Sequence, residues 1–496
     1  MLFNSAQYGF FLVAVLIVHW SLPQRWRRPF LLVASYFFYA SAIPQYIALI
    51  LGLTAFDYVM GLAIARAQGA WRRRLLWLAV AGNLGSLAYF KYTGLIMKTL
   101  APILAGMPLL SPLTHDTLLT NVLLPLGISF FTFEFIHYVV EVFKGTAPIR
   151  NVIDFALFAA FFPTQIAGPI KRFPDWMKQL RHPASLREID VDRGVWLILR
   201  GLVKKVIMAD VLAPVVATGF NHVNYLGPGA AWFAVFAFAT QIYCDFSGYT
   251  DMGRGSATLL GYSVPENFNR PYQSANPAEF WHRWHMSLST WLRDYLYIPL
   301  GGSRVSRRRI YINLMITMAL GGLWHGADWH FMVWGIYQGV LLAAHRYWGE
   351  TFGKSERWLQ VVASPIARFL TRVCTLVLVC AGWVFFRADT IAAALSMFVA
   401  MFAFGRPFTA GLHLTPFATP VLLLAVAALV VVSGWIWTEI REPVLDRLNR
   451  ALATLGQVWV AALHLAVLRP SLYAATVLLL LIWPPHTAQT FIYFRF

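Results

Sequence analysis

The residue best placed to do chemistry is a histidine at the end of an apolar run. His325 lies in Leu323-Trp-His-Gly326, after the run from Ile310 to Leu320 and the pair Gly321-Gly322. A buried imidazole favours its neutral form, so it could act as a general base that takes a proton from an acceptor hydroxyl while this oxygen attacks an activated acyl group. Small residues on either side would let substrate or backbone approach closely. The alternative is a structural histidine that hydrogen-bonds a neighbouring helix.

Two more histidines, His282 and His285, lie three residues apart. Histidines at this spacing can bind a metal on one helical face, and His325 would supply a third ligand. However, the sequence has no HExxH motif, no Cys/His cluster and no acidic residue at a recognised ligand spacing. We therefore predict no metal site. We expect His285 to orient the acyl carbonyl or the acceptor, and His282 to face solvent.

Acidic residues in apolar sequence form the third group of candidates. Asp245 and Asp251 are six residues apart and do not share a helical face, which argues against a paired acid–base device. Glu134, His137 and Glu141 are spaced i, i+3 and i+7 and could line a polar path along one helix. Buried structural hydrogen bonding is the default interpretation for all of them. The sequence has no GxSxG elbow and no phosphate-binding or dinucleotide-binding glycine motif, so covalent serine catalysis has no support.

The composition indicates that these residues lie in a membrane. Of 496 residues, 58% are hydrophobic and 12% are charged, whereas soluble proteins are about half apolar and a quarter charged. The formal net charge of +18 would suggest nucleic-acid binding in a soluble protein. Here the basic residues cluster between apolar runs, as in cytoplasmic loops, so we predict no nucleic-acid partner. The clusters are Arg25, Arg27 and Arg28; Arg72 to Arg74; Lys171 and Arg172; and Arg304 with Arg307 to Arg309.

The apolar runs predict an all-α polytopic membrane protein with roughly a dozen spans, since about 20 apolar residues cross the hydrocarbon. We treat residues 1–496 as one integral-membrane domain. Because a basic cluster follows the first run and none precedes it, we expect an outward N-terminus and a retained span rather than a signal peptide. The candidate runs are 8–22, 29–43, 45–65, 75–95, 118–143, 153–170, 191–219, 230–250, 310–324, 329–349, 366–386, 418–438 and 470–484.

The polar stretch 263–309 interrupts this pattern. Its dense mixture of charged and aromatic residues suits an interfacial helix or a re-entrant segment that lines a water-accessible cavity. At helical spacing, Trp281, His285, Ser289 and Leu292 would share one face. This face could line the cavity.

Several motifs in a core of about residues 120–345 resemble those of membrane-bound O-acyltransferases, above all the bacterial alginate O-acetyltransferase type. The run from Phe280 to Gly302, followed by Trp324-His325, is highly specific for that family. Trp383 to Arg387 and the aromatic ending 491–496 are also similar to it. The other motifs are Leu124 to Phe130, Phe162-Pro163 with Ile166 to Pro169, Asp245 to Tyr249, Pro265 to Pro271, and Gly321 to Ala327.

The resemblance implies that His325 is the catalytic histidine and that His285 lies near it in a membrane-embedded tunnel. It also implies a ring of helices around a central funnel, open to both faces of a bacterial inner membrane and surrounded by membrane lipid. Acetyl-CoA or another activated acetyl donor would act from the cytoplasm as a substrate, and we predict no bound cofactor. A separate periplasmic acetyltransferase would pass the acetyl group to an exopolysaccharide such as alginate. The candidate substrate-binding residues are Trp324, Asp245, Tyr249, Asn269, Trp284 and Ser289.

The sequence departs from the family pattern in three places. His282 stands where arginine is expected, Thr164-Gln165 replace a glutamine-leucine pair, and Arg254 lies in a stretch that often carries small or apolar residues. These changes avoid His325 but could alter the substrate or partner, so cellulose, another exopolysaccharide or a wall polymer are further acceptors. The alternative functions are transfer of D-alanine or another acyl group to a cell-wall polymer, a non-enzymatic polymer channel or transporter, and a scaffold for a polysaccharide synthase.

Overall fold

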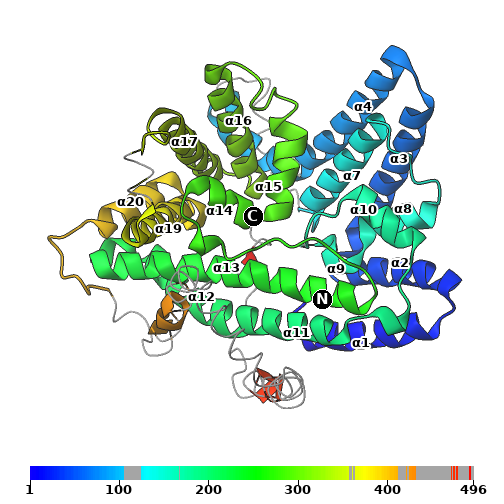
Figure 1. Ribbon diagram of the computed structural model, residues 1–496, viewed down its shortest axis with the longest axis horizontal. Coiled ribbons are helices and arrows are strands. Elements are labelled where there is room, and N and C mark those ends of the chain that lie inside the picture. The colour runs from blue at the N-terminus through cyan, green and yellow to red at the C-terminus, as the bar shows by residue number, and fades with distance from the viewer. Residues whose placement is uncertain are drawn as a thin grey trace.

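The computed structural model shows a helical protein in which longer helices lie around a central group of short helices (Figure 1). It describes residues 1–105, 124–166, 168–356 and 363–411, together with residue 360 and short pieces between 420 and 492. These residues form helices and no strand, so the predicted all-α class is confirmed. The candidate runs 418–438 and 470–484 lie mostly outside the described residues.

The N-terminal helices form one side of the molecule (Figure 1). Helices α3, α4 and α7 pack against one another, and α2 packs against α8. Asn83 of α4 donates to Asp57 of α3 at 2.8 Å, so two polar groups inside apolar helices satisfy each other. The elements are α1 (Ala6–Ser21), α2 (Gln24–Ala40), α3 (Ile47–Arg66), α4 (Gly69–Leu87), η2 (Ala88–Tyr92), α5 (Thr93–Ala105), α7 (Ile128–Phe143), α8 (Val152–Ala160), α9 (Phe162–Gln165) and α10 (Phe173–Arg181).

Glycines allow two long helices to pack closely in the middle of the chain. A Cβ on Gly248 of α13 would lie 2.8 Å from the backbone oxygen of Gly201, and one on Gly255 would lie 2.6 Å from that of Gly194. Small residues at such crossings are typical of membrane helices. Gly248 of the Asp245 to Tyr249 motif is therefore needed for packing. The elements are η4 (Leu186–Glu188), α11 (Val191–Leu202), the π-helical η5 (Val203–Ala209), α12 (Asp210–Asn221) and α13 (Pro228–Leu259).

The remaining helices place the candidate site near the middle of the view. In Figure 1, α14 and α15 lie between α16–α17 above, α13 below and α7 on the right. Helix α16 packs along α17, and α17 packs against α19. The elements are α14 (Pro277–Arg283), α15 (Met286–Leu292), the π-helical η8 (Arg293–Tyr297), α16 (Arg307–His325), α17 (Trp329–Thr351), α19 (Pro365–Arg387) and α20 (Ile391–Met401).

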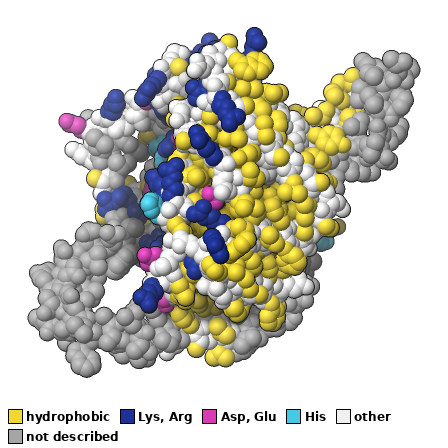
Figure 2. Space-filling view, turned by 90° about the vertical axis from the view of Figure 1, so that its right-hand side faces the viewer, with side chains coloured by type: hydrophobic (Ala, Val, Ile, Leu, Met, Phe, Trp, Pro, Cys, Tyr) yellow, Lys and Arg dark blue, Asp and Glu magenta, His cyan; other side chains and the backbone are white. Residues whose placement is uncertain are grey.

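The surface separates apolar from basic side chains. Figure 2 shows Lys and Arg gathered along one edge of a broad apolar face. Apolar side chains such as Phe37 and Trp77 are about two-thirds exposed, at 60% and 64%, which suits contact with lipid rather than water. Among the described helices, Pro44–Arg66 and Pro365–Arg387 are long and apolar enough to cross a membrane by length and composition. The exposed apolar face and the basic edge together agree with a membrane protein whose basic edge lies outside the hydrocarbon.

Within the stretch 263–309, the residues from Trp281 to Leu292 do not form the single helix that their spacing suggested. Helix α14 ends at Arg283, Trp284 is extended, and His285 adopts a left-handed conformation with φ 43° before α15 begins at Met286. The expectation that Trp281, His285 and Ser289 share a helical face is therefore wrong. Helical periodicity cannot place residues across a backbone reversal of this kind.

Candidate functional site

The close contact of α16 with α17 fixes the position of His325. A Cβ on Gly322 would lie 2.3 Å from the backbone oxygen of Phe331, and one on Gly335 would lie 2.3 Å from that of Met318. Any larger side chain would push the helices apart. The prediction that small residues beside His325 allow close backbone approach is confirmed for Gly322, which anchors the helix end that carries the histidine.

His325 is 4% exposed and lies among aromatic rings. Its ring centroid is 5.1 Å from that of Trp334 and 5.3 Å from that of Phe386, with the planes steeply inclined in both pairs. Trp324 stacks on Phe133 at 5.1 Å, and Phe133 stacks in turn on a further tryptophan. These large rings restrict the imidazole to a narrow range of orientations and exclude bulk water from most of its surface.

His285 lies next to His325. The two imidazole centroids are 6.5 Å apart and their planes are nearly perpendicular, at 88°. His285 is completely buried, and neither ring nitrogen has a hydrogen-bond partner among the described residues. A left-handed backbone at a non-glycine residue costs about 1–3 kcal/mol, and such strain clusters at functional sites. His285 is therefore a strained, buried imidazole, with its ring centroid 6.5 Å from that of a second imidazole and with hydrogen-bonding capacity that the described residues do not use.

The positions of His282 and His285 do not support the alternative that they bind a metal together. The reversal at His285 separates it from His282, which is exposed and whose Nδ1 lies 2.6 Å from the backbone oxygen of Ala278. The two histidines therefore do not converge on one face.

A π-helical turn brings a lysine to the carbonyl end of α16. Lys91 Nζ donates to the backbone oxygen of Trp324 and, at 3.5 Å, to that of His325. The Tyr92 hydroxyl donates to the oxygen of Leu323 at 3.0 Å. These bonds satisfy carbonyls that the helix end leaves without partners, and the ammonium charge complements the negative end of the helix dipole. We did not predict Lys91, although a lone lysine in the run 75–95 was a sequence signal.

A cavity of about 500 Å³ opens directly onto His325. The motif from Leu124 to Phe130 forms much of its wall, with Gly127 in a left-handed conformation at φ 75° that starts α7. Lys91 and Trp324 also line it, whereas His285 does not. The other lining residues are Met1, Leu2, Ala42, Ile43 and Ile166.

Asp245 and Tyr249 belong to a buried charge cluster. Lys205 Nζ lies 2.6 Å from Asp245 and 2.7 Å from Asp210, and all three side chains are at most 3% exposed. The backbone N–H of Ile492 donates to Asp245 at 2.7 Å. Tyr249 stacks on another aromatic ring of the C-terminal stretch. These contacts make Asp245 part of a buried ion-pair cluster, and its contact with substrate stays a prediction.

The other predicted substrate-binding residues differ in their surroundings. Trp284 is buried and packs against Phe280 at 5.5 Å, within the aromatic core. Asn269 is exposed, and Ser289 donates to the backbone oxygen of Trp284 at 3.1 Å. The buried asparagine is Asn267, whose Oδ1 accepts from the N–H of Ser287 at the start of α15. Asn267 thus supports the turn that carries His285, and only the fold distinguishes it from Asn269.

The predicted polar path along α7 is divided into two local networks. Glu134 is buried and accepts from Lys171 Nζ at 2.8 Å. One turn further, His137 is buried 5.2 Å from the ring of Tyr295, whose hydroxyl donates to Glu141 at 2.8 Å. Glu134 is thus committed to a buried ion pair with Lys171.

Comparisons with known proteins agree with these features. The model of the membrane-bound O-acyltransferase family matches residues 91–381. The chain is 41% identical over 444 residues to "Probable alginate O-acetylase AlgI" of Azotobacter vinelandii, covering 87% of this chain and 84% of that protein. It is 42% identical over 413 residues to the protein of the same name from Pseudomonas aeruginosa, covering 82% and 75%. It is 33% identical over 421 residues to the peptidoglycan O-acetyltransferase of Helicobacter pylori, covering 79% and 76%.

Proposed function

The chain belongs to the membrane-bound O-acyltransferase family and is an acyltransferase, and we propose that it moves acetyl groups for the O-acetylation of an extracellular polysaccharide such as alginate. The names of the relatives support this acceptor. The observation that carries the proposal is the buried His325 at the wall of a cavity of about 500 Å³, within the region that the family model matches.

In the proposed reaction His325 is a general base. It takes the proton of the acceptor hydroxyl as this oxygen attacks the carbonyl carbon of an acetyl thioester, for which acetyl-CoA is the simplest donor. The tetrahedral intermediate expels the thiolate, and the imidazolium returns the proton to the sulfur, which leaves an ester and a thiol. The aromatic surroundings of His325 exclude water, which would otherwise compete as the acceptor.

His285 is proposed to hydrogen-bond the acetyl carbonyl or the acceptor. Its two buried ring nitrogens, without partners among the described residues, support this role. A substrate group that satisfies one of them would repay part of the desolvation penalty, which is about 1–3 kcal/mol for a buried polar group.

The proposed arrangement is a multi-pass protein of the bacterial inner membrane, with about a dozen spans around a funnel. The placement of α14 and α15 between the other helices in Figure 1 supports a ring. The basic edge in Figure 2 supports a cytoplasmic side, because arginine and lysine favour that side of inner-membrane proteins. A periplasmic acetyltransferase is proposed to receive the acetyl group for the polymer.

The function is tested by the acetyl content of the host's extracellular polysaccharide. In cells from which this chain is deleted, the amount of polymer should persist while its ester-linked acetate falls to background, and the wild-type chain should restore the acetate. Loss of polymer export with normal acetylation of what is made would contradict the proposal and favour the channel. A polymer that loses D-alanine instead would favour the alternative acyl group.

Lys91 is predicted to position His325. Lys91→Met keeps the length of the stem but removes the bonds to the carbonyls of Trp324 and His325. Since a shift of about 1 Å in a catalytic group can cost about 100-fold in rate, we expect kcat for acetyl transfer to fall about 10-fold to 100-fold, with little change in KM for the donor.

Two variants control this measurement. Lys91→Arg should recover much of kcat because it keeps the charge. Lys98→Met removes an exposed lysine that pairs with Asp328 at 3.1 Å, and it should keep wild-type kcat. Equal kcat in Lys91→Met and Lys98→Met would rule out a positioning role.

A further inference from the structure

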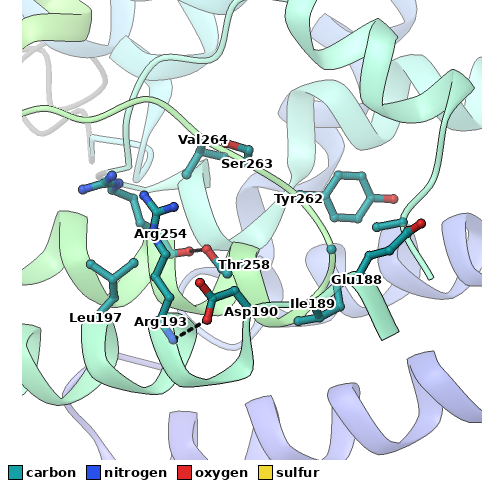
Figure 3. Close-up of a pocket in the computed structure, with 12 residues that line it drawn as sticks. Glu188, Ile189, Asp190, Arg193, Leu197, Arg254, Thr258, Tyr262, Ser263 and Val264 are labelled. Carbon is teal, nitrogen blue, oxygen red and sulfur yellow. Dashed lines mark hydrogen bonds between the residues drawn. The ribbon is translucent and has the colours of Figure 1, made fainter. Parts of the chain in front are cut away.

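We propose that a second cavity binds the phosphate-bearing headgroup of a membrane phospholipid. The cavity has a volume of about 210 Å³ and lies between the beginning of α11 and the end of α13 (Figure 3). It shares no lining residue with the cavity at His325. Two arginines, Arg193 and Arg254, come from different helices and line the same space.

The two guanidinium groups differ in how far protein carboxylates engage them, and Arg193 is the less engaged. Figure 3 shows both arginine side chains extending to the same side of the cavity, below Ser263 and Val264. Arg254 pairs with Glu266 at 2.7 Å through one guanidinium nitrogen and lies 4.0 Å from Asp251, and its side chain is 11% exposed. No described acidic side chain forms an ion pair with Arg193. Paired guanidinium groups bind phosphate oxygens well, because their N–H donors match the geometry of the anion.

The acidic residues of the cavity are largely engaged with the backbone. Glu188 accepts from the N–H of Ser185 at 2.7 Å, and Asp190 caps α11 by accepting from the N–H of Arg193 at 2.9 Å. They do not neutralise the guanidinium groups directly. Figure 3 shows Glu188 on the side away from the arginines, where it could face an amine of the same headgroup.

The position of the cavity favours a lipid over a soluble phosphate. A neighbouring small cavity shares Ala184, Gly261 and Tyr262 with it. That cavity is also lined by Arg27 and Arg28 at the start of α2, in a basic cluster that we predict to be cytoplasmic. Leu186, between the lining residues Ala184 and Glu188, is 54% exposed. Charged groups beside exposed apolar ones at the membrane surface suit a headgroup whose acyl chains lie along the protein.

This cavity is separate from the one at His325. The site therefore goes beyond the acyl-transfer function, and neither His325 nor the cavity beside it contributes a residue to it.

Binding is measured by native mass spectrometry of the protein released from nanodiscs that contain phosphatidylglycerol, phosphatidylethanolamine or phosphatidylcholine. We expect retained phospholipid, and about tenfold weaker retention in Arg193→Gln and in Arg254→Gln, since each variant removes a charged hydrogen-bond donor. Arg187→Gln removes an exposed arginine of η4 that does not line the cavity, and this variant should retain lipid as wild type does.

The outcomes of this experiment distinguish the possible sources of the phosphate group. Preference for phosphatidylethanolamine would assign the headgroup amine to Glu188, and preference for phosphatidylglycerol would leave the arginines as the main determinant; both support the site. Equal retention in wild type and in both cavity variants would refute it. Binding of inorganic phosphate without retention of any phospholipid would also refute it, because the occupant would then be a soluble anion.

Discussion

Replacement of His325 by alanine is expected to lower the rate of acetyl transfer by roughly 10²–10⁴-fold, the usual contribution of a general base. The residue is buried against Trp334 and Phe386, at the wall of the cavity beside α16. The nearby imidazole of His285, with ring centroids 6.5 Å apart, is the other base to be tested. The measurement is incorporation of labelled acetate from acetyl-CoA into polymer by membranes that hold the complete acetylation system.

The control is the transfer rate of His285→Ala, measured at the same protein level as His325→Ala. If His285 only orients the substrate, its loss should slow transfer less than the loss of His325. A His325→Ala protein that folds, reaches the membrane and keeps more than about a tenth of the wild-type rate would be incompatible with general-base catalysis. A trapped acetyl group on His325 would instead show that the reaction passes through an acyl-imidazole.

The sequence predicted the helical class and the juxtaposition of His325 with His285, because both depend on features that short motifs carry. Apolar runs specify helices, and the motifs around the two histidines carry the family resemblance. The backbone reversal at His285 was not predictable from spacing, since a left-handed histidine has no signature in one sequence. The bonds from Lys91 to the end of α16 were equally hidden, because they join residues 233 and 234 positions apart.

For the polar residues in the apolar runs, too, one property was predictable from the sequence and another was not. Burial of Asp57, Glu134 and Asp245 follows from their place in apolar sequence, but the partner of each depends on how helices pack. Asn83 and Lys171 serve the first two, and the third belongs to a cluster held together by a lysine from a π-helical turn. Such turns add a residue to the helix and rotate its side chains, so regular periodicity does not locate them.

Lys205→Met is expected to destabilise the fold by about 3–5 kcal/mol, because it leaves the carboxylates of Asp210 and Asp245 buried without their cation. The amount of protein in the membrane should fall, and its unfolding temperature in detergent should drop. Lys204→Met is the matched control: Lys204 pairs with Asp251, which keeps its bonds to Arg200 at 2.6 and 2.9 Å. This variant should stay close to wild type.

Asp245→Asn in the Lys205→Met background separates a structural role of Asp245 from contact with substrate. It removes one of the two uncompensated charges, so part of the lost stability should return, although Asp210 stays buried. If Asp245 acts on substrate instead, Lys205→Met should unfold at the same temperature as Lys204→Met, while Asp245→Asn alone lowers acetyl transfer. The ion pair at 2.6 Å and the bond from Ile492 at 2.7 Å favour the structural outcome, in which this cluster holds the C-terminal stretch beside the helix that faces His285.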